Sequence, residues 1–148
     1  MTTIVYDHKK RIIACDGRLM RGLEIRSETY QKWRETKEGI AFFAGTVADI
    51  DTFSKMMGVE FDKFPIKTDT TCLLVRDGKV YECNFDNDDG YFEIEMQFNA
   101  AIGSGGALAL SALYFGCSAK EAVKYAHSKD AGTGGEVYVY DIDKGEFL

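Results

Sequence analysis

The first residues of the chain, Met-Thr-Thr-Ile-Val, place a hydroxyl where it could become part of the N-terminus. Thr2 follows the initiator methionine, and its side chain is small enough for methionine aminopeptidase to remove Met1. Thr2 would then carry a free α-amino group and a hydroxyl on one residue. The amine could take the hydroxyl proton, because its ordinary pKa of about 7.7–8.0 lies close to physiological pH. The expected chemistry is attack on a peptide or amide carbonyl through an ester intermediate.

Further polar and glycine residues follow Thr2 in a recognisable order. Asp16 precedes a glycine, and Lys32 comes sixteen residues after Asp16. Three longer motifs complete the set: Ala-Gly-Thr-Val-Ala-Asp at 44–49, Gly-Ser-Gly-Gly at 103–106 and Asp-Ala-Gly-Thr-Gly-Gly at 130–135. With Thr-Thr-Ile-Val at 2–5, the set resembles the proteasome β-subunit and HslV family, from residue 2 to about residue 141. The resemblance implies an N-terminal-nucleophile (Ntn) hydrolase of the threonine peptidase type.

The resemblance also implies which side chains would form the catalytic site: Thr2, Asp16, Lys32, Gly45, Ser104, Asp130 and Thr133. A Lys32 ammonium beside Thr2 would make the hydroxyl more acidic and keep the amine uncharged, while Asp16 would hold the lysine in place. The N–H of Gly45 would stabilise the oxyanion of the tetrahedral intermediate. Ser104, Asp130 and Thr133 would complete the hydrogen-bond network around the amine.

Substrate and partner expectations follow from the same resemblance. By position, the pocket beside the nucleophile would be lined by Met20, Tyr30, Arg34, Phe43 and Val47. These residues favour apolar to mixed substrate side chains, with Arg34 accommodating an acidic group. We expect a homo-oligomer that cleaves peptides or unfolded proteins, with an unfoldase ATPase as partner for folded substrates. No cofactor and no metal is expected.

Two other functions stay open at this point. A catalytically silent structural or assembly protein could have the same fold with Met1 retained, because the Thr2 nitrogen would then be an amide without a basic lone pair. A small-molecule amidase would use the same Thr2 chemistry on another substrate. A phosphate loop at 103–106 is disfavoured, since neither a Walker lysine nor the Rossmann spacing follows. His8 and His127 have no serine or cysteine in the spacing of a catalytic triad.

Composition narrows the class of protein. The 148 residues are 45% apolar, which fits a single domain, 1–148, with a sizeable core. The net charge of −6 argues against nucleic acid as a main partner. No apolar run has the length of a membrane span, and no secretory signal is recognisable. The four cysteines form no Cys-x-x-Cys pair, which disfavours zinc and favours a reduced, cytoplasmic location.

Apolar periodicity and turn residues predict the elements that must position these side chains. Strands are expected at 2–6, 11–16, 40–44, 70–76, 79–84, 91–96 and 137–142. Helices are expected at 47–57, 104–115 and 118–129. We expect Asp77-Gly78 to form a type I′ hairpin turn, Ser104 to cap the second helix and Gly116 to end it, and Ser118 to open a capping box with Glu121. The inner face of the first helix would comprise Val47, Ile50, Phe53, Ser54 and Met57.

This pattern predicts an α+β sandwich in which paired helices cover one sheet. The resemblance narrows it to the Ntn-hydrolase fold, a sandwich of two antiparallel β-sheets with helical layers. HslV-like chains have two long helices after the motif at 44–49. This chain has room for one short helix before the hairpin that begins near residue 70. We therefore expect one helical layer to be reduced.

Overall fold

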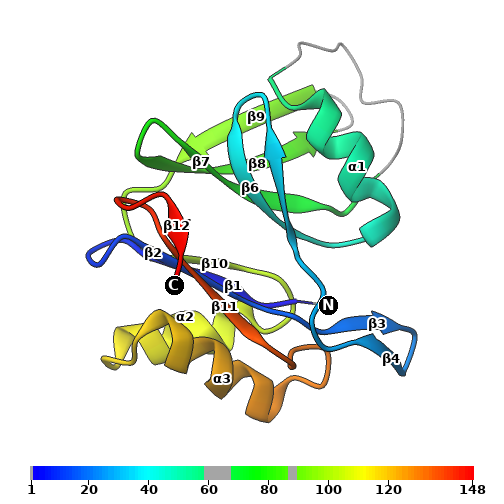
Figure 1. The fold of residues 1–148 in the computed structure, drawn as a ribbon, viewed down its shortest axis with the longest axis vertical. Coiled ribbons are helices and arrows are strands. Elements are labelled where there is room, and N and C mark those ends of the chain that lie inside the picture. Colours follow the sequence, from blue (N-terminus) through cyan, green and yellow to red (C-terminus); the bar gives the residue numbers. More distant parts are fainter. Residues whose placement is uncertain (1, 59–67, 87–89) are drawn as a thin grey trace. The chain divides into compact units, whose positions relative to one another are not determined.

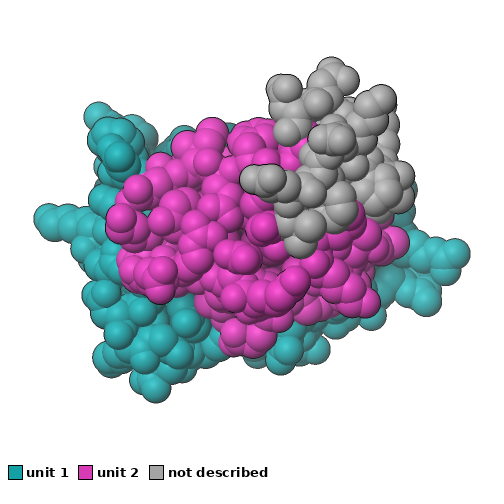
Figure 2. Space-filling model, turned by 90° about the horizontal axis from the view of Figure 1, so that it is seen from above, with its two compact units in different colours: residues 1–32, 97–148 teal, residues 33–96 magenta. Residues whose placement is uncertain are grey.

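The computed structural model describes residues 2–58, 68–86 and 90–148. The chain divides into two compact units, which Figure 2 colours separately: Met1–Lys32 with Gln97–Leu148, and Trp33–Met96. Both units contain an antiparallel sheet, so the predicted α+β class with antiparallel sheets is confirmed. The sequence also predicts a turn at 86–90 and a loop around Pro65, and both include residues that lie outside the described part. Among the described residues, no helix combines the length and the apolar character that crossing a bilayer requires.

The first unit is built on a five-stranded sheet with the N-terminal hairpin at its centre (Figure 1). Its strands, in spatial order, are β10 (Ala100–Ile102), β1 (Ile4–Asp7), β2 (Ile12–Asp16), β11 (Val137–Asp141) and β12 (Glu146–Phe147). The first two predicted strands form an antiparallel hairpin, with Val5 opposite Ala14. On its other side, Val5 pairs with Ala101. The sequence does not predict β10 or β12, because strands of three and two residues are too short to show alternation.

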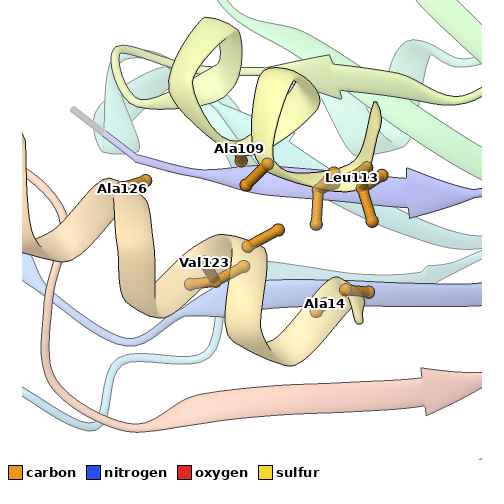
Figure 3. Packing of buried hydrophobic residues seen from close by; sticks show 9 residues of the cluster. Ala14, Ala109, Leu113, Val123 and Ala126 are labelled. Atoms are coloured by element: carbon orange, nitrogen blue, oxygen red, sulfur yellow. The ribbon is translucent and has the colours of Figure 1, made fainter. Parts of the chain in front are cut away.

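Two helices, α2 (Gly106–Tyr114) and α3 (Ala119–Lys129), cover one face of this sheet. Figure 3 shows how their inner side chains meet the strands: those labelled are Ala109 and Leu113 of α2, Val123 and Ala126 of α3, and Ala14 of β2. Most of these side chains are small, which allows the helices to approach the sheet closely. The unit also contains a separate hairpin of β3 (Leu19–Arg21) and β4 (Glu24–Ser27).

The helix ends follow the sequence signals with one exception. Ser118 accepts a hydrogen bond from the Glu121 N–H, and the Glu121 side chain accepts one from the Ser118 N–H, so the capping box is confirmed. Gly116 ends α2 with a φ of +98°, as expected. The prediction that Ser104 caps α2 is wrong, because Gly105 occupies the N-cap position without a side-chain bond. The Ser104 hydroxyl bonds a distant carboxylate instead.

Replacing Ser118 with alanine should remove the side-chain bond at the start of α3. We expect the free energy of unfolding to fall by about 1 kcal/mol, the usual cost of losing a serine cap. Urea denaturation measures this change. Ser128→Ala is the matched control, since Ser128 lies near the other end of the same helix and its hydroxyl donates to the Tyr125 carbonyl. Equal losses from the two substitutions would contradict the capping role.

The second unit is a five-stranded meander in chain order. Its strands are β5 (Trp33–Thr36), β6 (Gly39–Ala44), β7 (Thr71–Arg76), β8 (Lys79–Asp86) and β9 (Gly90–Glu95). Asp77 and Gly78 connect β7 to β8 with φ values of +52° and +73°. Two successive positive φ values are typical of a type I′ turn, so that prediction is confirmed.

One helix, α1 (Val47–Met56), packs on this sheet. The buried Phe53 ring meets the rings of Phe43 at 5.6 Å and Phe85 at 4.5 Å between centroids. Ile50 is also buried, but Val47 is exposed, so its predicted place on the inner face is wrong. At 3.6 residues per turn, Val47 is rotated by roughly 90° from the mean direction of Ile50 and Phe53.

The helical layer of the second unit is reduced, as expected: α1 is the single helix among its described residues. Farther along β7, on the face that carries Cys72 and Leu74, charged side chains replace apolar ones. Arg76 bonds Glu38 at 3.0 Å and Glu93 at 2.7 Å. The Arg76 guanidinium also lies 4.6 Å from the centre of the Tyr81 ring. These partly exposed side chains cover this part of the sheet, so a second helix is not required to cover it.

Candidate active site

The segment before β1 is held by backbone contacts with the Gly-Ser-Gly-Gly motif. Thr2 and Thr3 are both buried, and the N–H of Gly105 donates to the Thr2 carbonyl at 3.2 Å. Gly103 has a φ of +93°, and a Cβ atom at this position would overlap the Thr2 carbonyl. Only glycine therefore permits this close approach. The motif holds Thr2 in the first unit.

A chain of hydrogen bonds connects the Thr2 nitrogen to a carboxylate. The Thr2 N–H donates to Ser104 Oγ at 3.2 Å, and Ser104 Oγ donates to Asp130 Oδ2 at 2.6 Å. Thr133 Oγ1 donates to the same carboxylate oxygen at 2.7 Å. Burial acts to raise the pKa of Asp130, but bonds from Ser104, Thr133 and the Gly132 N–H outweigh it and lower this pKa below its ordinary value. The Ser104 oxygen thus keeps a lone pair directed at the Thr2 nitrogen.

Asp16 and Lys32 form a buried ion pair in the same unit, 2.6 Å between Oδ1 and Nζ. Their side chains are 0% and 4% exposed, so neither charge is compensated by water. Asp16 also accepts bonds from the backbone N–H groups of Thr3, Gly134 and Arg18, which satisfies both carboxylate oxygens. Burial lowers the pKa of Lys32, although the Asp16 charge opposes the shift. Lys32 and the Thr3 N–H share one oxygen, so the ammonium lies next to the Thr2–Thr3 segment.

Two further positions contact the predicted site and were not identified from the sequence. Thr3 Oγ1 lies 2.7 Å from Thr133 Oγ1, and Thr3 is the donor because the Thr133 hydrogen is directed at Asp130. The doubled threonine at the N-terminus was the available signal for Thr3. Arg18 bonds Glu28 and the Ala131 carbonyl, which anchors the loop that carries Asp130 and Thr133. No pattern around Arg18 indicates this contact.

The first unit therefore brings together most of the predicted catalytic set: Thr2, Asp16, Lys32, Ser104, Asp130 and Thr133. Gly45 belongs to the second unit, and its role beside Thr2 stays a prediction. Its φ is +130°, and a Cβ there would lie 2.7 Å from the Thr70 Cα. Glycine is thus required at this corner between β6 and α1 for steric reasons alone.

The residues predicted to line a substrate pocket differ in their surroundings. Met20 on β3 and Tyr30 are half-buried in the first unit. In the second unit, Val47 is exposed, and Arg34 forms a surface ion pair with Asp51 at 3.3 Å. Phe43 is buried under α1, where it contributes to the core and presents no surface to a substrate. The core packing of Phe43 follows from its alternation with Phe42 along β6.

Comparisons with solved structures place this arrangement among known folds. HslV from Trypanosoma brucei superposes with a TM-score of 0.68 and 19% identity over 93% of this chain and 97% of that chain. This chain has the fold of HslV. BPH from Thiobacillus denitrificans is similar as well, at 16% identity and a TM-score of 0.67, over 94% of this chain and 95% of that one. A structure of BPH in complex with epoxomicin matches at 15% identity, with a TM-score of 0.67 and coverage of 94% and 97%.

The likeness to HslV is one of fold. No protein-family model matches the sequence, and no curated protein is similar to it. The superposition nevertheless spans nearly the whole chain. The resemblance seen in five short motifs is thus supported by the fold.

The lowered pKa of Asp130 predicts how stability depends on pH. A carboxyl whose pKa is lower in the folded state stabilises the fold above its unfolded pKa of about 3.9. That contribution is lost as the pH falls through the folded value. We expect Asp130→Asn to lower the free energy of unfolding at pH 7, and the difference from wild type to shrink in acid. Urea denaturation across this range tests it, and a difference that does not change with pH would contradict it.

Proposed function

We propose that this chain is an N-terminal threonine peptidase that acts through Thr2 after removal of Met1. The observation that carries the proposal is the convergence of two networks on one buried segment. The Asp16–Lys32 ion pair reaches it through the Thr3 N–H, and the Ser104–Asp130 chain reaches it through the Thr2 nitrogen. Burying a lysine and a carboxylate costs desolvation energy, and ionisable groups perturbed in this way cluster at functional sites. The HslV fold supports the same proposal.

The proposed reaction uses the Thr2 amine as base and then as acid. Thr2 Oγ attacks the carbonyl carbon of the substrate while the amine takes the hydroxyl proton. The amine then gives this proton to the leaving nitrogen as the C–N bond breaks, which leaves an ester on Thr2. Water attacks the ester, and its proton passes through the amine back to Thr2 Oγ. The Lys32 charge favours the developing alkoxide, and Asp16 fixes the position of the ammonium.

Gly45 is the proposed oxyanion donor. Its N–H would stabilise the negative oxygen of the tetrahedral intermediate, a contact whose loss typically costs on the order of 10²–10³ in rate. The proposed substrates are peptides or unfolded proteins, with an unfoldase ATPase supplying the latter. The proposed working form is a homo-oligomer. The free thiols at Cys15, Cys72, Cys83 and Cys117 support a reducing, cytoplasmic setting.

Epoxomicin, the ligand of the BPH complex, provides the direct test. A peptide epoxyketone forms a ring with an N-terminal residue only if that residue has both a free amine and a hydroxyl. We expect intact-mass spectrometry to show loss of Met1 and then an increase equal to one inhibitor. Fragmentation should locate the adduct on Thr2. A Met1-free sample that gains no mass would contradict the proposal.

The same experiment separates the two other functions. Persistence of Met1 in protein from a host with active methionine aminopeptidase would favour the silent assembly protein. An adduct on Thr2 without cleavage of any fluorogenic peptide in a broad panel would favour the small-molecule amidase. Thr2→Ala is the control for labelling, because alanine is also small enough for Met1 removal and lacks the hydroxyl.

A further inference from the structure

Gly134 and Gly135 directly follow Thr133, and the proposed reaction does not explain why neither position has a side chain. A Cβ atom on Gly134 would lie 2.6 Å from Nη2 of Arg18. A Cβ atom on Gly135, whose φ is +72°, would lie 2.7 Å from Oε2 of Glu28. The double glycine therefore leaves room for one pair of side chains, Arg18 and Glu28.

Arg18 and Glu28 form a two-pronged ion pair against these glycines. Nε of Arg18 donates to one carboxylate oxygen of Glu28 at 3.1 Å, and Nη2 donates to the other at 2.9 Å. The third nitrogen, Nη1, donates to the Ala131 carbonyl at 3.0 Å. The Arg18 side chain is only 14% exposed. A planar guanidinium with all three nitrogens bonded is held in one orientation, which distinguishes it from an ordinary surface ion pair.

One end of this pair reaches the loop that carries Asp130. Ala131 follows Asp130 directly, so the bond from Arg18 to its carbonyl fixes the loop between α3 and β11, which lies near the start of β3 (Figure 1). The Gly134 N–H, in the same loop, donates to Oδ2 of Asp16 at 2.9 Å. The Arg18 N–H donates to the same oxygen at 3.3 Å. Arg18 thus connects Asp16 to the loop through both its backbone and its side chain.

The other end of the pair reaches the segment that leads to Lys32. Glu28 lies between β4 and Lys32, and its carbonyl accepts a bond from the Glu136 N–H at 2.8 Å. The Tyr138 hydroxyl donates to the next carbonyl, that of Thr29, at 2.9 Å. Both donors follow the double glycine in the chain. The path of the backbone into Lys32 is therefore set by contacts with the segment that follows the double glycine.

We call Arg18 and Glu28 the clamp. We propose that the clamp positions the buried ion pair and the Ser104–Asp130 chain relative to each other at Thr2. The opposite charges of the clamp compensate each other, so its contribution is geometric rather than electrostatic. A displacement of about 1 Å in a catalytic arrangement can lower a rate on the order of 10²-fold. The inference rests on the proposed peptidase function, which supplies the reaction that needs this geometry.

Substitutions of Arg18 test the clamp. Arg18→Gln removes the two-pronged bond, and Arg18→Lys removes it while keeping the charge. We expect both to lower kcat for peptide cleavage, and the rate of epoxomicin labelling, by roughly 10- to 100-fold with KM little changed. Arg26→Gln is the matched control. It breaks a 3.0 Å ion pair with Glu24 on β4, where the side chains are 47% and 65% exposed, and should keep the wild-type rate.

Gly134→Ala tests the same contact without changing Arg18. The added Cβ should push the guanidinium away from Glu28, while the Gly134 N–H is kept. We expect a loss of rate similar to that of Arg18→Gln. The two substitutions together should cost no more than either alone, because their effects pass through one contact. Losses that multiply in the double variant would contradict the clamp.

The completeness of labelling separates positioning from a loss of stability. A merely structural role would reduce the fraction of chains that accept epoxomicin and leave the rate for each competent chain unchanged. Positioning predicts the reverse. In Arg18→Ala, guanidinium ion at millimolar concentration should restore part of the labelling rate, whereas ammonium ion should not, because it has the charge without the planar donors. Equal recovery with both ions would overturn the geometric role.

Hydrogen exchange of the Gly134 amide provides a readout that needs no activity. We expect faster exchange in Arg18→Gln than in wild type, because the loop is no longer held against Asp16. Unchanged exchange, or labelling of Arg18→Gln at the wild-type rate, would overturn the clamp. A wild type that accepts no epoxomicin, together with faster exchange in Arg18→Gln, would contradict the peptidase proposal and support the clamp as the contact that holds the two networks.

Discussion

Replacing Thr2 with alanine is expected to abolish peptide hydrolysis and leave the fold intact. The substitution removes the proposed nucleophile, and loss of a nucleophile in a hydrolase typically lowers kcat on the order of 10⁴- to 10⁶-fold. The fold should persist because Thr2 is held through its backbone. Its N–H bonds Ser104 and its carbonyl accepts from Gly105, and alanine keeps both groups. Fluorogenic peptide cleavage measures the activity, and thermal unfolding measures the stability.

Thr2→Ser is the matched control, because serine keeps both the amine and the hydroxyl. We expect it to retain hydrolysis and to accept the epoxomicin label. Thr3→Val provides a second comparison. It removes a hydroxyl of the same network that bonds Thr133 but is not the nucleophile, so activity should fall without disappearing. Hydrolysis by Thr2→Ala at the wild-type rate would exclude the proposed mechanism.

Replacing Lys32 with methionine is expected to cost both activity and stability. The side chain stays unbranched, becomes one heavy atom shorter and loses its charge, which leaves Asp16 buried without its cation. Removing one partner of a buried ion pair typically destabilises a protein by about 3–5 kcal/mol. The backbone donors Thr3 and Gly134 would remain on Asp16, so the cost should fall toward the lower end of that range. The buried pair therefore predicts that loss of Lys32 destabilises the fold as well as lowering activity.

A second substitution separates the two effects of Lys32. In Asp16→Asn/Lys32→Met neither buried charge remains, so we expect the free energy of unfolding to recover part of the loss seen in Lys32→Met alone. Hydrolysis should not recover, because the cation next to Thr2 is still absent. Urea denaturation and peptide cleavage of the same samples provide both readouts. A double variant less stable than either single variant would show that an unpaired charge is not the cause.

Local rules explain why much of the fold was predictable. The N-terminal hairpin, the turn at Asp77-Gly78 and the capping box at Ser118 each depend on residues close in sequence. Such interactions do not require contacts with distant parts of the chain, so the local sequence is enough to predict them. The α+β class followed from the order of strand and helix patterns. The reduced helical layer was predicted because the stretch after Gly45 is shorter than the resemblance to HslV-like chains implies.

The same rules fail where a residue has two possible partners. Ser104 stands where a helix cap is expected, but its hydroxyl bonds Asp130, because the loop after α3 returns to the start of β1. Val47 fits an inner helical face by type, but its angle around the helix directs it outward. Phe43 matches a pocket position by resemblance and is packed under α1. For Ser104 the competing contact comes from a segment that is distant in sequence.

By itself, the sequence determined the kinds of group available to this protein: a threonine behind the initiator methionine, an aspartate and lysine sixteen residues apart, and three glycine-rich motifs. The tertiary structure alone decided their partners. The Thr2 nitrogen meets Ser104 across 102 positions, and Asp16 meets the Gly134 N–H across 118. The pairing of β1 with β10, and of β2 with β11, produces these contacts. Side-chain types fix what chemistry is possible, whereas burial and strand pairing decide which groups come within a hydrogen bond of one another.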